Sequence, residues 1–398
     1  MRDAVQILSF VHNDGIVAYA ALCGRRIAPR TAGKRDLAIL KQLIAPEAYV
    51  ASEWDLLADA AGRESWVEYF RRHLDTLLAE LRRSYPDAPE QRVAALRDDY
   101  LRRFDEVARR PERFERLDVL TLDRIVSSVL DEYGFADPFA ALKFDTTAAA
   151  LRHYSRLCAR LDELEPAPQL ETLVRGLLAG NLFDVGAPDA VRRHAEHKAS
   201  FERTRASLAP RPWRFDDADE FIESVAARRH EHVAFFVDNA GGDTVLGALP
   251  VVRWLLRAEC RVTLCANSAP ALNDVTAREL AALLDRAPIR DDDVLARARN
   301  AGRLRVVASG STTPLLDLTA LSDECVSAVA DADLVMLHGM GRSVESNWNV
   351  ALSCAHTHSA MLKDRRVAAR LGAELFDCVF RYAPARAESA AAASRKRG

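Results

Sequence analysis

The chain has 398 residues, enough for two domains of ordinary size or one large one. Hydrophobic residues make up 49% and charged residues 28%, a globular composition that argues against a disordered or fibrous protein. The formal net charge is -3, and Lys and Arg are scattered rather than gathered into a stripe, which argues against nucleic acid as the main partner. The composition is compatible with a small ligand, including an anionic one.

The opening residues, MRDAVQILSFVHNDG, lack a basic stretch followed by a long apolar one. No apolar run reaches the roughly 20 residues of a membrane span, so we expect a cytoplasmic protein with no membrane partner. The seven cysteines are odd in number and never spaced as C-x-x-C, which indicates neither a disulfide framework nor a zinc ribbon. We expect most of them to be small core residues.

The pattern of residues 35–205 is helical. Trp66, Phe70 and Leu74 recur at helical spacing, with arginines on the opposite face, and further helices are expected at 90–108 and 118–133. We expect residues 1–215 to form a helical subdomain that covers an active cleft.

After a proline-marked connection at 208–220, short apolar runs alternate with helical stretches. This alternation predicts an α/β fold with a mostly parallel, Rossmann-like sheet flanked by helices over residues 216–384. The expected strands are 232–237, 261–265, 304–308, 333–337, 359–362 and 378–382. The expected helices include 244–257, 277–285, 321–330 and 365–371. The end, residues 385–398, is basic and of low complexity and is expected to be a disordered tail.

Polar residues follow the expected strands where those strands end. Ligands of open α/β sheets bind beyond the carboxyl ends of the strands, where loops and helix amino-termini converge. Asp238 and Asn239 follow the first expected strand, and Asp274 lies in the loop after the second. Two carboxylates and an amide oxygen are hard ligands suited to Mg²⁺ or Mn²⁺, so these three residues are the expected metal set. Each one alone is also typical of a turn or a helix N-cap.

Later strand ends offer groups for phosphate. Hydroxyls, backbone N–H groups, a guanidinium and an ammonium can together hold phosphate oxygens. The residues expected to do so are Ser309, Gly310, Ser311, Gly339, Gly341, Arg342 and Lys363. These residues, apart from Lys363, come from two loops, 309–313 and 339–342. The first loop is also typical of an ordinary polar turn, and the second of a glycine turn. No P-loop and no strand-linked G-x-G-x-x-G is present, which disfavours ATP hydrolysis and dinucleotide redox chemistry.

Two further groups of residues are candidates for function. Cys354, His356 and His358 resemble a soft-metal cluster, but their i, i+2 spacing and the lack of a fourth ligand argue against zinc. In the helical half, Asn181 and Asp184 lie three residues apart and could share one helix face toward a substrate, although a capped helix end explains them equally well.

Five motifs taken together, VDNAGGDTVLGALPVVRWLL, CANSAPALNDVT, ASGSTTPLLDLT, DADLVMLHGMGR and LFDCVFRY, resemble in order and spacing the metal-dependent damage-control phosphatase family. The match is closest to its subfamily II, which includes the phosphatase domain of pantothenate-kinase-4-like proteins, and it extends over about residues 45–384. The resemblance implies a divalent metal (Mn²⁺, Co²⁺, Ni²⁺ or Mg²⁺) on Asp238, Asn239 and Asp274. It also implies hydrolysis of phosphate monoesters such as 4'-phosphopantetheine or its damaged forms, or of sugar phosphates in other branches.

One position departs from the family motif. Subfamily II is expected to carry E-G-M-G-R, and here His338 replaces the acid. An imidazole at that strand end attracts an anion where a carboxylate repels it, so we count His338 among the expected substrate-binding residues. A tolerated substitution whose side chain turns from the cleft is the alternative.

The resulting hypothesis is a metal-dependent phosphoric monoester hydrolase acting on a small phosphorylated metabolite. The metal would lower the pKa of an attacking water and neutralise charge on the phosphoryl group, with Asp238, Asp274 and Lys363 as catalytic residues. Three alternatives remain: a phosphatase for a sugar phosphate or a biosynthetic intermediate, a non-catalytic metabolite-binding protein, and a carboxyl methyltransferase. The last lacks a persuasive adenosyl-binding loop.

Overall fold

The computed structural model describes residues 37–182 and 201–385, all of which belong to one compact unit that begins at Leu37. The expected tail from residue 386 onwards, Cys23 and the expected site residue Asp184 lie outside the described residues.

The helices of the described part, in chain order, are α2 Ala60–Ser84, α3 Glu90–Arg109, η1 Pro111–Arg113, α4 Val119–Glu132, α5 Ala140–Asp162, α6 Pro166–Leu182, α8 Phe201–Ser207, α9 Ala218–Ala226, η2 Asp243–Ala248, α10 Leu249–Arg257, α11 Ala277–Leu284, α12 Asp293–Asn300, α13 Asp323–Ala328, η3 Met340–Glu345 and α14 Arg365–Arg370. The strands are β1 Leu37–Ala38, β2 Phe215–Asp216, β3 His232–Phe236, β4 Arg261–Ala266, β5 Leu304–Ala308, β6 Leu321–Ser322, β7 Leu334–His338, β8 Ala355–Met361 and β9 Cys378–Ala383.

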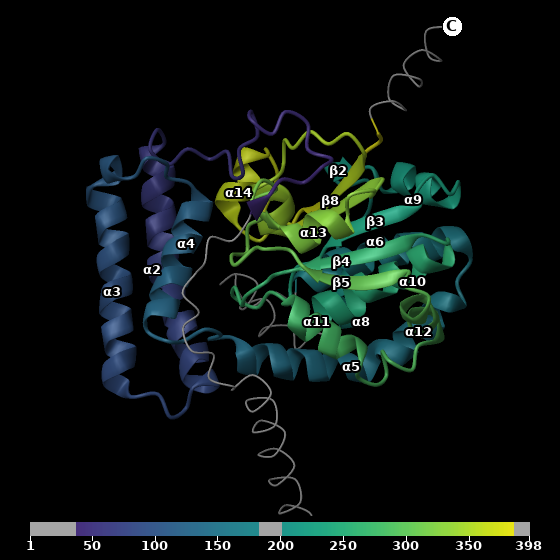
Figure 1. The fold of residues 1–398 in the computed structure, drawn as a ribbon, viewed down its shortest axis with the longest axis horizontal. Helices are drawn as coiled ribbons and strands as arrows, with labels where there is room; N and C mark the ends of the chain where they lie inside the picture. Colours follow the sequence, from purple (N-terminus) through teal and green to yellow (C-terminus); the bar gives the residue numbers. More distant parts are fainter. Residues whose placement is uncertain (1–36, 183–200, 386–398) are drawn as a thin grey trace, which may run out of the picture. The chain divides into compact units, whose positions relative to one another are not determined.

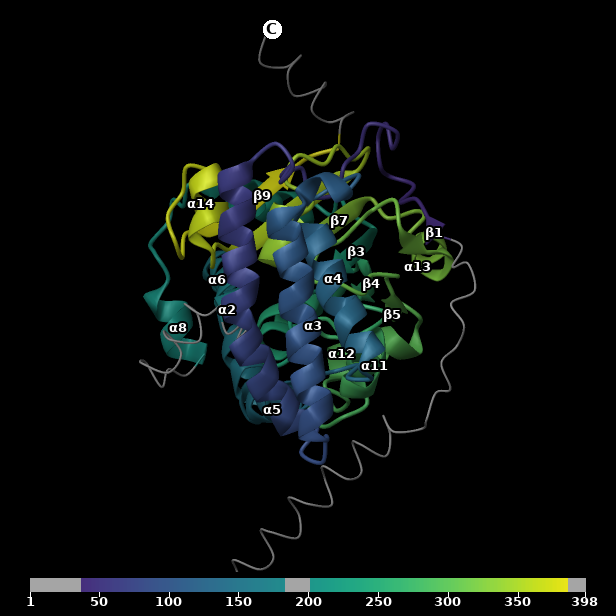
Figure 2. The same cartoon turned by 90° about the vertical axis from the view of Figure 1, so that its left-hand side faces the viewer.

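Seven strands form one sheet in the order β2-β9-β8-β7-β3-β4-β5, and a short β1-β6 pair lies apart from it. All pairs in the large sheet are parallel except β8 with β9. Helices lie against the sheet in Figures 1 and 2. The expected α/β class with a mostly parallel, helix-flanked sheet is therefore confirmed.

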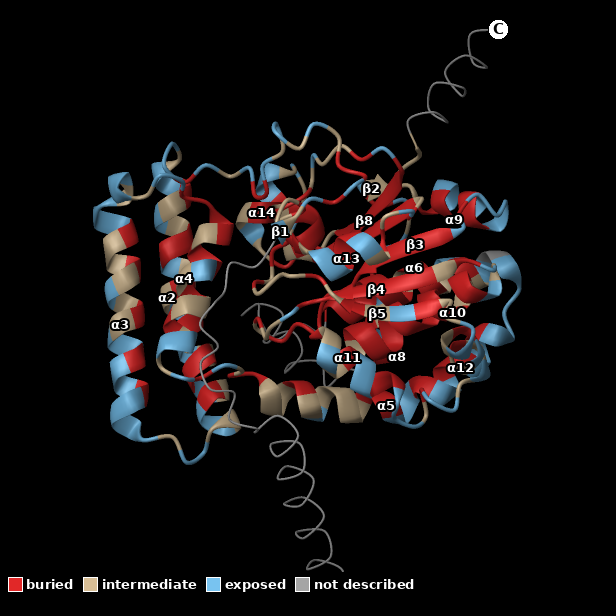
Figure 3. Cartoon of the chain, viewed as in Figure 1, coloured by how far each residue is buried: buried red, intermediate tan, exposed pale blue. Residues whose placement is uncertain are grey.

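The central strands β3, β7 and β8 are buried along their whole length, as expected for a parallel sheet covered on both faces. Neighbouring residues of β3 enter different cores: Phe235 packs among α5, α6 and α10, whereas Phe236 packs against the α13 side. Figure 3 shows the central strands, such as β3 and β4, in the colour of buried residues and the outer turns of the helices largely in that of exposed ones. None of the helices in the described part is long and apolar enough to cross a membrane.

The helices α2, α3 and α4 lie side by side in Figures 1 and 2. Their apolar stripe, which includes Trp66, Phe70 and Leu74, shares one hydrophobic core with Ala360 of β8 and Val379 of β9. Asp59 caps the start of α2 by accepting a hydrogen bond from Gly62 N at 2.8 Å. The division at residue 215 stays a prediction; β2 lies across it and pairs with β9.

Three expected elements differ from the structure. The helix expected at 321–330 begins two residues later, because the Ser322 hydroxyl caps Cys325 N at 3.0 Å and leaves Leu321–Ser322 extended as β6. The connection expected at 208–220 contains β2 and the start of α9. The strand expected at 359–362 begins earlier, at Ala355, and the sequence did not indicate this start because His356, Thr357 and His358 are polar although they are buried.

Candidate active site

The loops after β3 and β4 meet beyond the carboxyl ends of these strands. Asn239 and Asp274 are paired as an isolated antiparallel bridge, and Val275 N donates to Asp238 O at 2.9 Å. The side chains of all three expected metal residues are buried, with at most 6% of each residue exposed. The backbone thus brings together Asp238, Asn239 and Asp274, which the sequence placed at separate strand ends.

The guanidinium of Arg342 joins the two carboxylates. It donates through Nη1 to Asp238 Oδ1 and through Nη2 to Asp274 Oδ2 at 2.8 Å and Asn267 Oδ1 at 2.9 Å. Arg342 is buried, so this is a charge-assisted network shielded from solvent. Burial raises the pKa of Asp238 above its usual value, although Arg342 opposes that shift.

A third carboxylate, Asp243, lies behind the Asp-Asn pair at the start of the π-helical turn η2. It accepts hydrogen bonds from Asn239 N at 3.2 Å, Asn239 Nδ2 at 3.0 Å and Asn181 Nδ2 at 3.2 Å. Asp243 therefore holds the amide of Asn239 in one orientation. The sequence predicted only a helix start at this residue; the signal it offered was a second acid five residues after Asp238.

His338 faces Asp243 rather than the pocket. Its Nε2 lies 2.8 Å from Asp243 Oδ1, and its Nδ1 lies 2.8 Å from Ser359 Oγ. A carboxylate can only accept, so Nε2 carries a proton. Burial alone would raise the pKa of Asp243, but the nearby His338 brings it below its usual value. The expected role of His338 in binding substrate stays a prediction, and the structure shows it as a partner of Asp243.

Two glycines of the H-G-M-G-R segment leave room for the site. Gly339 has a φ of 95°, and a Cβ there would lie 2.1 Å from Asp238 Cγ. Only glycine therefore allows the chain to pass beside that carboxylate. A Cβ on Gly341 would lie 2.8 Å from Pro314 O.

Lys363 and Asn181 meet at the ends of β8 and α6. Lys363 Nζ donates to Asn181 O at 3.0 Å. Asn181 Oδ1 accepts from Met361 N at 3.1 Å, and Asn181 Nδ2 donates to Asp238 Oδ2 at 2.8 Å. The helical half thus contributes Asn181 to the carboxylate network, a contact that the sequence did not predict. The expected role of Asn181 in binding substrate stays a prediction, and its expected companion Asp184 lies outside the described residues.

The S-G-S-T-T loop lies beside the site, with its polar groups turned largely to its own backbone. Ser311 Oγ donates to Leu315 O at 3.0 Å, and Gly310 N donates to Ser268 Oγ at 2.7 Å. Ser311 N donates to Ser309 Oγ at 3.2 Å. A pocket lies over the strand ends, and Leu315 belongs to its lining, whereas Ser309, Gly310 and Ser311 do not. Their contact with phosphate stays a prediction.

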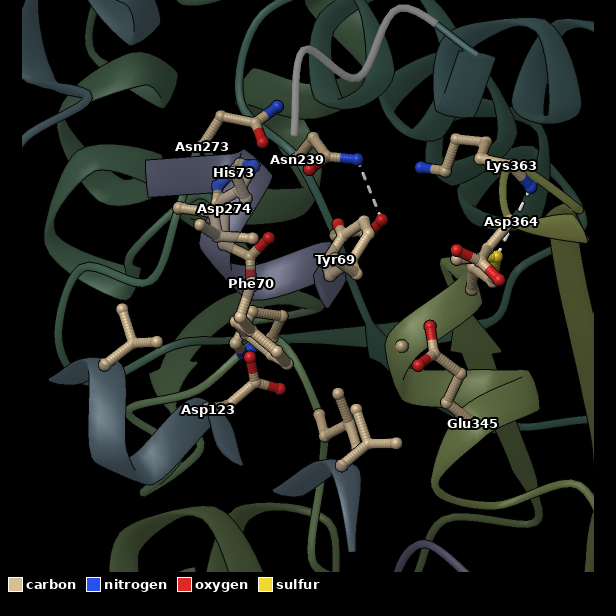
Figure 4. Close-up of a pocket in the computed structure, with 18 of the residues that line it drawn as sticks. Tyr69, Phe70, His73, Asp123, Asn239, Asn273, Asp274, Glu345, Lys363 and Asp364 are labelled. Atoms are coloured by element: carbon tan, nitrogen blue, oxygen red, sulfur yellow. Dashed lines mark hydrogen bonds between the residues drawn. The ribbon is translucent and has the colours of Figure 1, made fainter. Parts of the chain in front are cut away.

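That pocket has about 830 Å³ of space, part of it open to solvent. Figure 4 shows side chains from α2 and α4 and from the strand-end loops around the same space. Its lining includes an aromatic wall from α2 and the polar strand ends: Trp66, Tyr69, Phe70, Asp238, Asp274 and Lys363.

Two acids that the sequence pattern did not indicate also line this pocket. Burial, with a smaller contribution from the neighbouring Asp364, raises the pKa of Glu345 to about 8. Burial likewise raises the pKa of Asp123 well above its usual range, with Glu345 adding to the shift. Within the described ranges neither carboxyl has a hydrogen-bond or ion-pair partner. Both carboxyls therefore hold a proton more readily than a solvent-exposed acid does, and both face the ligand space.

The two histidines of the Cys354, His356 and His358 group lie near backbone oxygens. His356 and His358 lie on β8, with ring centroids 5.5 Å apart. His358 Nδ1 lies 3.0 Å from Ser343 O, and burial lowers the pKa of His358 to about 3. No set of three or more His, Cys, Asp or Glu side chains suited to a metal occurs in the described part of the chain.

The expected metal set contains two carboxylates and an amide, all hard oxygen donors. One observation shows a further donor: Asn273 Oδ1, in the pocket lining next to Asp274, is buried without a hydrogen-bond partner among the described residues. A buried acceptor in that position is satisfied by a cation or a water. The side chains of Asp238, Asn239, Asp274 and Asn273 therefore fit a hard divalent cation.

The chain is similar to several known proteins. Residues 58–379 match the family model of the damage-control phosphatase ARMT1-like domain. A damage-control phosphatase of Arabidopsis thaliana is 33% identical over 322 residues, covering 80% of this chain and 87% of that protein. A 4'-phosphopantetheine phosphatase of Mus musculus is 29% identical over 403 residues, covering 88% of this chain and 49% of the mouse protein.

A protein of Arabidopsis thaliana named pantothenate kinase 2 is 33% identical, and the chain spans 42% of its length. Among solved structures, a DUF89 family protein from Pyrococcus horikoshii superimposes with a TM-score of 0.56 at 16% identity, covering 80% of this chain and 95% of that one. This last likeness concerns the fold. Because the family model spans most of the chain and the site has the expected strand-end residues, the chain belongs to the ARMT1-like damage-control phosphatase family.

Proposed function

We propose that this protein is a metal-dependent phosphatase that hydrolyses a small phosphate monoester, with 4'-phosphopantetheine or a related damaged phosphometabolite as the substrate class. The observation that carries the proposal is the meeting of Asp238, Asn239 and Asp274 in one buried set beside the pocket. Family membership and the name of the mouse relative support the reaction type and the substrate class.

Asp238, Asn239 and Asp274, with Asn273 beside them, would hold the divalent cation (Mn²⁺, Co²⁺, Ni²⁺ or Mg²⁺). When bound, such a cation supplies Lewis-acid stabilisation of phosphoryl charge and a more acidic water. The chain keeps the donors oriented, because Asp243 fixes the Asn239 amide and Arg342 fixes the two carboxylates. Such hydrogen bonds behind the ligands are part of what makes a metal site selective.

We assign different roles to the two basic side chains of the site, Arg342 and Lys363. Arg342 is bound to carboxylates, so its role is to hold Asp238 and Asp274 in place. Lys363 lines the pocket, and its ammonium is the positive group placed to attract a phosphate there. Gly341 also lines the pocket and permits close approach of a ligand to the backbone.

The organic part of the substrate would lie against α2 and α4. The wall of Trp66, Tyr69 and Phe70 offers aromatic faces, and Asp123 and Glu345 offer carboxyl groups whose pKa values are raised by burial, which favours their uncharged form. Uncharged acids donate hydrogen bonds to amide or hydroxyl oxygens and do not repel the substrate's phosphate. This lining favours a neutral polar chain, as in phosphopantetheine, over a sugar bisphosphate.

The test is phosphate release from 4'-phosphopantetheine, 4'-phosphopantothenate and a set of sugar phosphates, with each of the four metals and with EDTA. The proposal predicts metal-dependent release that EDTA abolishes, with the neutral phosphopantetheine chain preferred. A panel with no release but with measurable binding of the same compounds would contradict catalysis and favour a metabolite-binding protein.

A further inference from the structure

A second pocket lies next to the first, with about 820 Å³ of space, part of it open to solvent. Trp54, Trp348 and Arg370 line it, and none of them lines the first pocket. Val119 and Glu345 line both pockets. The two spaces are therefore neighbours that share parts of one wall.

The shared wall contains Glu345, an acid with no hydrogen-bond or ion-pair partner in the described part of the protein. Glu345 belongs to the π-helical turn η3, the same turn that carries Arg342 to the carboxylates. In the described ranges its carboxyl forms no hydrogen bond or ion pair, and burial raises its pKa to about 8. Glu345 is half-buried and lines both spaces, so a ligand or water in either pocket can reach its carboxyl. Its position between the pockets suits a ligand that passes from one to the other.

The lining of the second pocket combines aromatic rings with polar side chains. The guanidinium carbon of Arg370 lies 4.4 Å from the centre of the Trp54 ring, and Asn349 Nδ2 donates to Glu53 Oε2 at 2.6 Å. Arg370 and Asn349 are exposed, so a ligand can reach their donors. Indole faces and uncharged or cationic donors together suit the end of a chain rich in amide carbonyls, with no further anion required.

We propose that the second pocket is a distal subsite of the same substrate-binding cleft, occupied by the far end of an elongated phosphate monoester whose uncharged polar chain passes Glu345. The phosphate lies at Lys363 in the first pocket, and the chain end lies between Trp54, Trp348 and Arg370. This inference rests on the proposed phosphatase function and adds a length requirement to it.

A pair of substrates separates the two ideas. One is 4'-phosphopantetheine, and the other is 2,2-dimethylpropyl phosphate, a short monoester that lacks the amide chain. The variant is the double substitution Arg370→Ala with Asn349→Ala, both at exposed residues of the distal pocket. The matched control is Arg365→Ala, an exposed arginine on the same helix α14 that lines neither pocket.

We expect the double variant to raise KM for 4'-phosphopantetheine about tenfold, the equivalent of ~1.4 kcal/mol of binding. Its kcat/KM for the short monoester and its melting temperature should stay within the range of the Arg365→Ala control. Equal effects on both substrates, or no effect on either, would overturn the distal subsite while the phosphatase function stands. If wild-type protein hydrolyses neither substrate with any of the metals, the proposed function fails and the subsite falls with it.

Discussion

His338 Nε2 and Asp243 Oδ1 lie 2.8 Å apart, and both side chains are buried behind the Asp238–Asn239 loop. Asp243 also accepts hydrogen bonds from the Asn239 backbone and side chain, so the imidazole acts on the expected metal set through one intervening carboxylate. The family motif is expected to carry a glutamate at position 338. Here an acid–imidazole pair takes the place of two adjacent acids.

The pair predicts how substitutions at 338 respond to pH. In His338→Glu two buried carboxyls would lie side by side, and one of them would have to hold a proton. We expect the melting temperature of this variant to fall by several degrees between pH 6 and pH 8.5 relative to wild type. His338→Gln keeps a neutral donor for Asp243 and should lack that fall. Identical pH profiles for the two variants would contradict the assigned contact.

Gly339 should tolerate no side chain. Both Gly339 and Gly134 have positive φ, 95° and 71°, but a Cβ at Gly134 meets nothing within 4 Å, whereas one at Gly339 meets the Asp238 carboxylate. Gly339→Ala and Gly134→Ala therefore share the cost of backbone conformation and differ only in the clash. We expect phosphate release to fall at least about 100-fold in Gly339→Ala alone. Similar activities in the two variants would show that the contact with Asp238 is unimportant.

Glu345 gives a prediction for stability against pH. Its pKa is raised from 4.5 to about 8 in the folded protein, so between these values the unfolded chain has released a proton that the folded chain still holds. Stability therefore falls as pH rises through this window, and Glu345→Gln removes the loss.

We expect the melting temperature of Glu345→Gln to exceed that of wild type by about 3 °C at pH 9, with almost no difference at pH 5. The control is Glu374→Gln, at an exposed glutamate outside both pockets, which should match wild type at both pH values. A constant difference across the range would mean that Glu345 is ionised throughout.

Lys363 should act on the substrate rather than on the cation. Its ammonium is buried at the pocket, and removing a preorganised charge from a phosphoryl site costs about 100-fold or more in rate. We expect Lys363→Met to lower kcat/KM by at least that factor while calorimetry shows Mn²⁺ affinity within about threefold of wild type. Normal turnover in this variant would remove Lys363 from the reaction.

The sequence was sufficient to predict where the main strands end and which polar residues lie just beyond them. Asp238, Asn239 and Asp274 could be identified because polar residues directly after a buried apolar run have few ways to be satisfied. The amphipathic spacing of Trp66 and Phe70 predicted a helix with one apolar face, and these residues are buried. The order of apolar and polar residues along the chain is visible in the sequence, and it indicates which side chains are buried.

The partners of these residues could not be predicted in the same way. His338 meets Asp243 across 95 residues, and this contact depends on β7 lying between β3 and β8 in the sheet. Strand order is a property of the whole fold. The Arg342 guanidinium was expected to bind phosphate, because the sequence could not show that the carboxylates of Asp238 and Asp274 lie within hydrogen-bonding distance of it. Asp123 and Glu345 resemble ordinary surface acids until the packing of α4 and η3 places them in the pocket.

Phosphate release is proposed to depend on a cation held by Asp238 and Asp274. The decisive measurement is Mn²⁺ binding by calorimetry together with phosphate release from 4'-phosphopantetheine, for wild type, Asp238→Asn, Asp274→Asn and the exposed control Asp323→Asn. We predict that each of the first two variants loses at least about 100-fold in Mn²⁺ affinity and releases phosphate no faster than wild type with EDTA, while the control matches wild type. Wild-type release by Asp238→Asn would contradict this assignment.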